Sequence, residues 1–291
     1  MKFLEIKSFA KINLSLDVLG SLEGGYHEVE TVMQTVSLYD RINLKVNEGS
    51  NFDIKLDTNK SFLPKDNRNL AYKAASLMKE RYDIKGSFDI YIEKRIPVAA
   101  GLAGGSSNAA AVIIGINELL NLKLSLDEML SLGKELGTDI PFLIYTGLKK
   151  EQVCIGVNRG EILKPISSKF FSNLVLAKPR FGVSTKEVYE GIDKIKEYPH
   201  PNHKELIEDL EDNNHKKVYS NMINVLENYT LKEYKEVKEL KAKMIAEDAE
   251  FALMSGSGPT VVGFYNSKEK AKEVCKLIRE TGIEAYHCAT K

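Results

Sequence analysis

The most informative stretch of this chain is short and rich in glycine. It reads Pro97-Val98-Ala99-Ala100-Gly101-Leu102-Ala103-Gly104-Gly105-Ser106-Ser107. The three glycines allow positive φ angles and a close approach of the backbone to a ligand. The apolar residues that follow, from Ala109, recur at helical spacing, so we expect a helix to begin at the loop. Because the first N–H groups of a helix lack intrahelical partners, a nucleotide phosphate is the expected ligand.

Two familiar glycine motifs do not fit this loop. A Walker A loop requires Gly-x4-Gly-Lys-Ser/Thr, but no lysine follows Gly104 or Gly105. A dinucleotide fingerprint requires Gly-x-Gly-x-x-Gly, and the glycines here are spaced otherwise. The loop alone leaves two interpretations open, a different kind of phosphate site or a glycine-rich connection before a buried helix.

The composition is that of a globular protein without a bias toward charged partners. Of its 291 residues, 43% are hydrophobic, which suffices for two domains. The 41 basic residues balance the 41 acidic ones, so we expect no nucleic-acid or membrane partner. We expect no secretory signal or membrane span, because charge interrupts the apolar runs. The three cysteines are odd in number and widely spaced, which fits a reducing, cytoplasmic location.

The order of predicted elements indicates an α+β protein with domains over residues 1–164 and 165–291. Apolar patterns predict strands in the first part over residues 3–6, 12–19, 29–36, 42–46, 52–56 and 87–92. Helices are expected over 69–81, from the glycine loop onward, and over 125–136. In the second part we expect strands over 174–177, 251–254, 260–265 and 283–288, and helices from 184, over 230–246 and over 268–281.

Capping patterns locate several of these helix starts. Capping boxes occur at Ser125/Glu128, Ser184/Glu187 and Thr230/Glu233. After the helix that Ser125 begins, Pro141 should bias the residue before it toward an extended conformation. We therefore expect Asp139 at a fixed bend outside a helix, a suitable place for a catalytic carboxylate.

Three further segments accompany the glycine loop. They are Ala10-Lys11-Ile12-Asn13-Leu14, Thr138-Asp139-Ile140-Pro141-Phe142 and Ser255-Gly256-Ser257-Gly258-Pro259-Thr260. The whole set resembles the motifs of the GHMP kinases, small-molecule kinases named for galactose, homoserine, mevalonate and phosphomevalonate. The resemblance covers most of the chain. It implies an N-terminal domain like domain 2 of ribosomal protein S5 and a ferredoxin-like C-terminal domain.

Lys7 to Leu14, Gly25 to Thr31 and Asp139 to Phe142 narrow this resemblance to kinases of the non-mevalonate isoprenoid pathway. It implies ATP-dependent phosphorylation of the 2-hydroxyl of a methylerythritol unit carried on cytidine diphosphate. The alternatives are a GHMP kinase of the homoserine or mevalonate type, and a non-catalytic nucleotide- or RNA-binding protein on the same fold. The retained Lys11 and Asp139 speak against loss of catalysis.

The resemblance implies that Lys11 and Asp139 are the catalytic residues. A carboxylate can accept the hydroxyl proton, while an ammonium keeps that carboxylate ionised and stabilises charge near the transferring group. Without the motifs, either residue would be interpreted as part of an ordinary ion pair. Since phosphoryl transfer depends mostly on positioning, Asp139 is expected to orient the hydroxyl as much as to deprotonate it.

ATP with Mg²⁺ is the implied phosphate donor, bound by the loop from Pro97 to Ser107. Because the loop has no Walker lysine, lysines from elsewhere should help to neutralise the triphosphate. Lys94 is one candidate, and a solvated strand end is the alternative interpretation. Ser106 and Ser107 could bind phosphate or magnesium-bound water, or cap the helix.

The resemblance also implies a cytosine site at Tyr26 and His27, through stacking and hydrogen bonding to the base. Tyr189 could supply a second aromatic ring or belong to the core, and Asn13 is expected to contact the substrate.

We expect the segment Ser255 to Thr260 to support the glycine loop, with a plain β-turn as the alternative. His200 and His203 lack an evident third ligand, so we expect a surface turn rather than a metal site. The protein is expected to be a monomer or weak homodimer.

Overall fold

The computed structural model describes residues 1–47, 49, 53–212 and 214–291, which form two compact units. Unit 1 comprises Met1–Ala10, Tyr39–Val98 and Ala103–Lys150. Unit 2 comprises Lys11–Leu38, Ala99–Leu102 and Glu151–Lys291. The units are therefore discontinuous in sequence, and the division at residue 164 stays a prediction.

Two long strands contribute residues to both units. They are β1 (Lys2–Ser21) and β2 (His27–Asn47), which pair with each other. We expected each to be two shorter strands, because polar residues interrupt the apolar pattern. This expectation was wrong, since backbone pairing continues through the interruptions. A short 3-10 helix, η1 (Glu23–Gly25), connects them.

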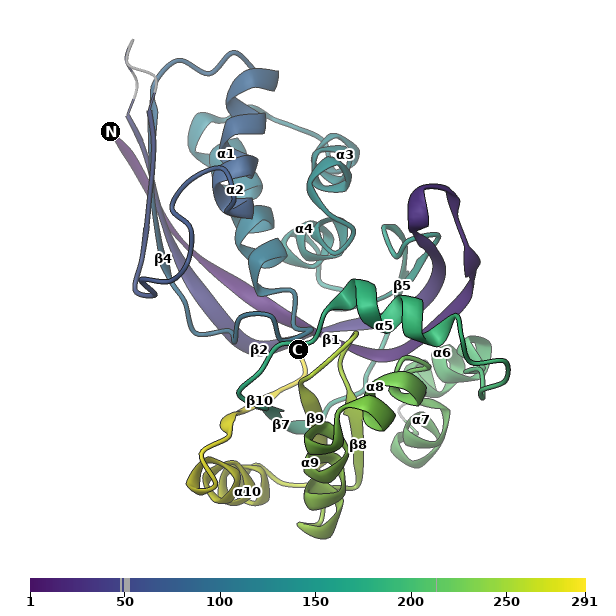
Figure 1. Cartoon of the computed structure of the whole chain (residues 1–291). Helices are drawn as coiled ribbons and strands as arrows, with labels where there is room; N and C mark the ends of the chain where they lie inside the picture. The colour runs from purple at the N-terminus through teal and green to yellow at the C-terminus, as the bar shows by residue number, and fades with distance from the viewer. Residues whose placement is uncertain (48, 50–52, 213) are drawn as a thin grey trace. The chain divides into compact units, whose positions relative to one another are not determined.

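In unit 1, helices cover one face of a sheet. The C-terminal part of β2 pairs with β4 (Ser87–Glu93), and β4 pairs in parallel with β3 (Asp53–Thr58). The predicted strand over 52–56 thus lies at β3, although Phe52 lies outside the described residues. The helices are α1 (Leu70–Arg81), α2 (Gly104–Leu120), α3 (Leu126–Leu136) and α4 (Ile140–Leu148) (Figure 1).

Unit 2 contains a hairpin and a separate antiparallel sheet. The hairpin strands β5 (Val153–Val157) and β6 (Ile162–Ile166) extend the N-terminal part of β2. The separate sheet has the order β10-β7-β9-β8, formed by β7 (Asn173–Lys178), β8 (Phe251–Met254), β9 (Val261–Tyr265) and β10 (Glu284–Ala289). This order is that of a ferredoxin-like domain, so the α+β fold class is confirmed.

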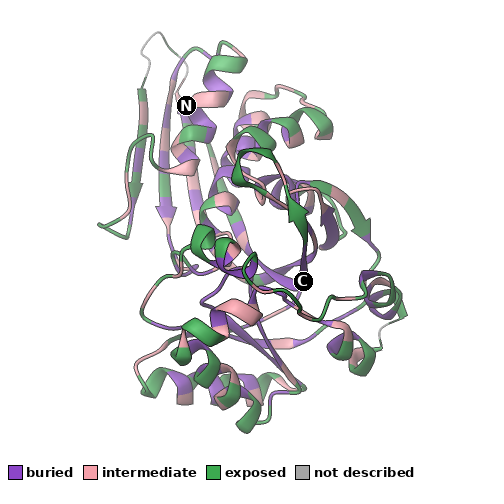
Figure 2. Cartoon of the chain, turned by 45° about the vertical axis from the view of Figure 1, so that its right-hand side comes forward, coloured by how far each residue is buried: buried purple, intermediate pink, exposed green. Residues whose placement is uncertain are grey.

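The helices of unit 2 pack on this sheet and beside it. They are α5 (Thr185–Ile192), α6 (His203–Asp212), α7 (His215–Asn221), α8 (Glu227–Glu233), α9 (Lys235–Ala246) and α10 (Lys268–Glu280). Helix α10 buries one apolar stripe and exposes its charged side (Figure 2). Among the residues that the structure describes, no helix is long and apolar enough to cross a membrane.

The capping predictions had mixed outcomes. Ser125 and Glu128 form both bonds of the capping box, and Ser184 accepts from the backbone N–H of Glu187. The predicted helix over 230–246 is wrong, because the chain leaves helical geometry at Tyr234 and separates α8 from α9. Thr230 therefore lies inside α8 rather than at a helix start.

Candidate active site

Lys11 and Asn13 lie on one face of β1, as residues two apart on a strand do. Both are buried, and Lys11 Nζ donates to Asn13 Oδ1 at 2.8 Å. The backbone N–H of Lys11 donates to the carbonyl oxygen of Leu102 at 3.3 Å. Within unit 2 the predicted catalytic lysine thus directly contacts a predicted substrate residue and the backbone of the glycine loop.

The carboxamide of Asn13 is oriented by a residue that our sequence analysis did not assign to the site. Asn13 Nδ2 donates to Thr31 Oγ1 at 2.8 Å, and that hydroxyl donates to the carbonyl oxygen of Ser15 at 2.7 Å. Since the Thr31 proton is directed to a carbonyl, its oxygen must act as the acceptor for Asn13. Asn13 Oδ1 is therefore directed to Lys11.

Asp139 immediately precedes α4 in unit 1 and has helical dihedral angles, φ −79° and ψ −18°. As expected, it lies in the turn between α3, which ends at Leu136, and α4, but the extended conformation expected for the residue before Pro141 is wrong, because Ile140 begins α4. Pro141 lies in the first turn, where a helix tolerates proline because the missing N–H would have no intrahelical partner. Gly133 of α3 permits close packing, since a Cβ there would lie 3.2 Å from the backbone nitrogen of Pro141. Asp139 is thus fixed at the start of a packed helix.

The glycine loop is tied to the third glycine motif within unit 2. Gly101 has a φ of +72°, and a Cβ on it would lie only 2.2 Å from the carbonyl oxygen of Ser255. The Ser255 hydroxyl donates to the carbonyl oxygen of Gly101 at 3.0 Å. Ser255 Oγ also accepts from the backbone N–H of Asn13 at 3.4 Å. The predicted contact between the third motif and the glycine loop is confirmed.

Helix α2 begins at the loop, as predicted. Ala103 has a left-handed conformation with φ +52°, and the helix starts at Gly104. A Cβ on Gly104 would lie 2.7 Å from Lys94 Nζ, so glycine is required for this packing. Ser107 donates to the carbonyl oxygen of Phe9 and accepts from the hydroxyl of Ser8, both at 2.7 Å. Its hydroxyl therefore anchors the first turn of α2 to β1.

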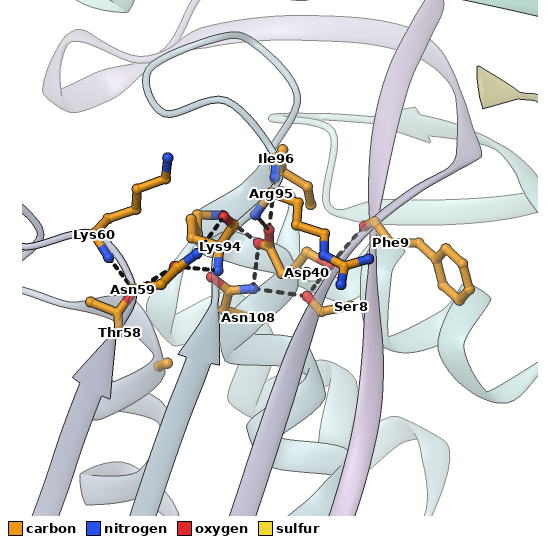
Figure 3. Close-up of polar contacts among 12 residues, drawn as sticks. Ser8, Phe9, Asp40, Thr58, Asn59, Lys60, Lys94, Arg95, Ile96 and Asn108 are labelled. Atoms are coloured by element: carbon orange, nitrogen blue, oxygen red, sulfur yellow. Dashed lines mark hydrogen bonds and ion pairs between the residues drawn. The ribbon is translucent and has the colours of Figure 1, made fainter. Parts of the chain in front are cut away.

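Lys94 is neither a solvated strand end nor an exposed cation. Its ammonium is buried and forms an ion pair with Asp40, within a polar cluster of unit 1 (Figure 3). Burial lowers the pKa of Lys94, and the Asp40 carboxylate counteracts this effect. The alternative interpretation of Lys94 as a solvated strand end is wrong, because β2 brings a carboxylate to this position from 54 residues away.

The residues predicted for cytosine binding come together in unit 2. The rings of His27 and Tyr189 are tilted by 36° with centroids 4.8 Å apart. His27 Nε2 lies 3.0 Å from Asp193, which our sequence analysis missed. Tyr26 is 54% exposed, and the guanidinium of Arg159 lies 4.8 Å from the centre of its ring. Tyr189 also packs against the core of unit 2, while its part in cytosine binding stays a prediction.

His203 differs from the predicted surface turn. It is buried, with Nε2 2.8 Å from Ser15 Oγ and Nδ1 2.9 Å from Glu30. His200 Nδ1 lies 2.7 Å from Asp17. The two histidines thus attach the start of α6 to β1, at residues that follow Lys11 and Asn13 along the strand.

Known structures share this fold over the whole chain. The TM-score is 0.82 to a crystal structure of 4-(cytidine 5′-diphospho)-2C-methyl-D-erythritol kinase, at 29% identity and with 99% of each chain covered. It is 0.74 to L. major mevalonate kinase in complex with R-mevalonate, at 16% identity and with 100% and 97% covered, a likeness of fold alone. Residues 69–147 match the GHMP kinases N terminal domain, and residues 199–284 match the GHMP kinases C terminal family. Fold and site together define a GHMP kinase, a class that uses ATP as its phosphate donor.

Sequence relatives assign the chain to a narrower family within the GHMP kinases. A 4-diphosphocytidyl-2-C-methyl-D-erythritol kinase from Clostridium botulinum (strain Eklund 17B / Type B) is 45% identical over 285 residues, covering 97% of this chain and 98% of the relative. One from Clostridioides difficile (strain 630) is 44% identical over 288 residues, covering 97% and 95%. The chain belongs to the family of 4-diphosphocytidyl-2-C-methyl-D-erythritol kinases.

Proposed function

We propose that this protein transfers the γ-phosphoryl group of ATP to the 2-hydroxyl of 4-diphosphocytidyl-2-C-methyl-D-erythritol. The observation that carries the proposal is a chain of hydrogen bonds in unit 2. It runs from Lys11 to Asn13, from Asn13 to Ser255 and from Ser255 to Gly101. It joins the lysine motif, the third glycine motif and the glycine loop, as a phosphoryl-transfer site requires.

Asp139 and Lys11 are the proposed catalytic residues. The Asp139 carboxylate accepts the proton of the substrate hydroxyl and orients its oxygen toward the γ-phosphorus. The Lys11 ammonium stabilises the negative charge of the transferring group. Its position is fixed by Asn13, so little reorganisation is needed during the reaction.

Backbone N–H groups of the glycine loop and of the first turn of α2 are the proposed ligands of the triphosphate. The left-handed residues Gly101 and Ala103 shape the loop before the helix start. Lys94 is already paired with Asp40, so we do not assign it a direct phosphate contact. Backbone dipoles therefore add to the positive potential that the Lys11 ammonium supplies.

Mg²⁺ is the proposed metal. Within the described residues, no group of three or more His, Cys, Asp or Glu is placed to hold an ion. This fits a magnesium ion held mostly by the triphosphate and water, because Mg²⁺ in such sites uses one or two protein ligands. The Ser107 hydroxyl already donates to the carbonyl oxygen of Phe9. We therefore propose that the hydroxyl that binds magnesium or its bound water is that of Ser106. When bound, Mg²⁺ neutralises phosphate charge.

His27 and Tyr189 are proposed to hold the cytosine, with Tyr26 beside them. A ring face can stack on the base, while the histidine hydrogen-bonds its edge. Asp193 accepts from His27 Nε2 and so favours the tautomer or cation with a proton on that nitrogen. The other ring nitrogen is then available to donate a hydrogen bond to the base or to accept one from it.

The remaining proposals concern the whole protein. We propose a cytoplasmic enzyme that acts on a small molecule, without nucleic-acid or membrane partners, as a monomer or weak homodimer. The balanced charge of the chain supports the absence of nucleic-acid and anionic-membrane partners. We also retain residues 1–164 and 165–291 as the proposed evolutionary domains.

A coupled assay of ADP release tests the function. The wild type should turn over 4-diphosphocytidyl-2-C-methyl-D-erythritol, and Asp139→Asn should lose about 100-fold to 10,000-fold in kcat. Asp127→Asn, an exposed aspartate on neighbouring α3, is the matched control and should keep the wild-type rate. Equal rates for the wild type and Asp139→Asn would refute the role of Asp139.

A further inference from the structure

Asp40 is a fully buried carboxylate to which the proposed reaction assigns no role. It lies on the part of β2 that belongs to unit 1, with 0% of its surface exposed. Oδ1 accepts from the backbone N–H groups of Arg95 at 2.6 Å and Ile96 at 2.8 Å. Oδ2 accepts from the Lys94 ammonium and from Asn108 Nδ2, the latter at 2.9 Å (Figure 3).

The partners of Asp40 stand on both sides of the glycine loop in the sequence. Lys94, Arg95 and Ile96 form the segment that leads into the loop, while Asn108 lies in the second turn of α2, which follows it. Asn108 Nδ2 also lies 3.0 Å from Ser8 Oγ, which donates to Ser107. One carboxylate therefore ties the entry of the loop to the helix at its exit.

We propose that Asp40 is a positioning residue of the ATP site, whose carboxylate holds both ends of the glycine loop. The N–H groups at the start of α2 then keep one position before the nucleotide arrives. Preorganised dipoles of this kind bind charge without a cost of reorganisation. The inference deepens the proposed function, and it rests on the glycine loop being the ATP site.

The ion pair with Lys94 explains how a carboxylate can be buried here. An isolated charge in a protein interior is strongly unfavourable, and pairing with hydrogen bonding offsets this cost. The Lys94 ammonium packs under Gly104, near the positive end of α2. Without Asp40, this cation would face the helix N-terminus uncompensated. Lys94 thus neutralises Asp40, and the acceptor oxygens of Asp40 hold the loop.

The competing explanation is that the ion pair between Asp40 and Lys94 only stabilises the fold. Two double variants distinguish this explanation from the proposed role in positioning the loop. Asp40→Asn with Lys94→Met removes both charges but leaves one oxygen to accept from Arg95 and Ile96. Asn108 can turn its amide to accept from the new side-chain NH₂. Asp40→Leu with Lys94→Met removes the same charges and also the acceptor. The two double variants therefore differ in the hydrogen bonds to the loop and not in net charge.

The test measures the dissociation constant of ATP by calorimetry without the alcohol substrate, together with that of the cytidyl alcohol alone. The leucine double variant should bind ATP about tenfold or more weakly than wild type, because a loop displaced by about 1 Å loses its aligned N–H groups. The asparagine double variant should stay within about threefold. Both should bind the cytidyl alcohol as the wild type does.

Equal ATP affinity of two folded double variants would overturn the proposal, as would an equal loss of both ligands. If the leucine variant fails to fold, Asn108→Ala decides, because it cuts the link from Asp40 to α2, together with the bond from Asn108 to Ser8, and keeps the bonds of Asp40 to Arg95 and Ile96. It should weaken ATP binding about threefold or more, and wild-type affinity would contradict the proposal. Absence of turnover in the wild type with intact ATP binding would refute the proposed function and not the role of Asp40.

Discussion

The ammonium of Lys11 donates to the side-chain oxygen of Asn13 at 2.8 Å, and both residues are buried on the same face of β1. A buried ammonium needs such acceptors, because its transfer from water is otherwise strongly unfavourable. Asn13 in turn depends on Thr31 for its orientation. The Asn13 carboxamide and the Thr31 hydroxyl, both neutral groups, therefore help to position the proposed catalytic cation.

Thr31→Val should reduce kcat about tenfold to 100-fold, because the Asn13 carboxamide loses the acceptor that orients it. The KM for ATP should change less than about twofold. Thr31→Ser keeps the hydroxyl and should restore most of the rate. Steady-state kinetics of the three proteins check this, and a wild-type kcat in Thr31→Val would contradict it.

Gly101→Ala should raise the KM for ATP about tenfold or more. The new Cβ would overlap the carbonyl oxygen of Ser255, and the φ of +72° is unfavourable for alanine. Gly20→Ala is a suitable control, since a Cβ there meets nothing within 4 Å. ATP titrations should separate the two variants, and similar KM values in both would contradict the close packing.

Tyr189→Leu should raise the KM for the cytidyl substrate about tenfold, the loss expected for one aromatic ring that stacks on a base. Tyr189→Phe keeps the ring and should stay near the wild-type value. The KM for ATP should be the same in both variants. A loss in Tyr189→Phe as large as that in Tyr189→Leu would exclude stacking as the cause.

His203 should make stability sensitive to acid. Burial lowers its pKa from the ordinary 6.5, although Glu30 and Asp17 oppose the shift. The folded state then favours the neutral ring, so this contribution is complete above 6.5 and is lost as the pH falls toward the folded-state pKa. The free energy of unfolding should therefore fall as the pH is lowered below about 6.5. His203→Gln should flatten this slope, and parallel slopes would contradict the assignment.

Local signals in the sequence predicted much of this structure. The glycine loop, the start of α2 and the capping box at Ser125 depend on neighbouring residues, so their patterns are complete within a few positions. Alternation of side chains along a strand places Lys11 and Asn13 on one face of β1, although their hydrogen bond was not predicted. These features needed no knowledge of distant contacts.

The missed features depend on distant residues or on competing local effects. Asp40 meets Lys94 from 54 positions away, so the sequence alone left a phosphate contact and a solvated strand end open for Lys94 and did not predict this ion pair. His203 was assigned to a surface turn because no third metal ligand was evident, and its partners Ser15 and Glu30 lie far away in the sequence on β1 and β2. Pro141 discourages helix in general, yet the first turn of α4 accommodates it.

The most direct test of the central claim is a comparison of alcohol acceptors with radiolabelled ATP. Purified wild-type protein is given 4-diphosphocytidyl-2-C-methyl-D-erythritol, mevalonate or homoserine at equal concentration, and the phosphorylated products are separated. The proposed function predicts label on the cytidyl alcohol, at its 2-hydroxyl, at a rate at least about 100-fold above either competitor. Turnover of mevalonate or homoserine with none of the cytidyl substrate would contradict it.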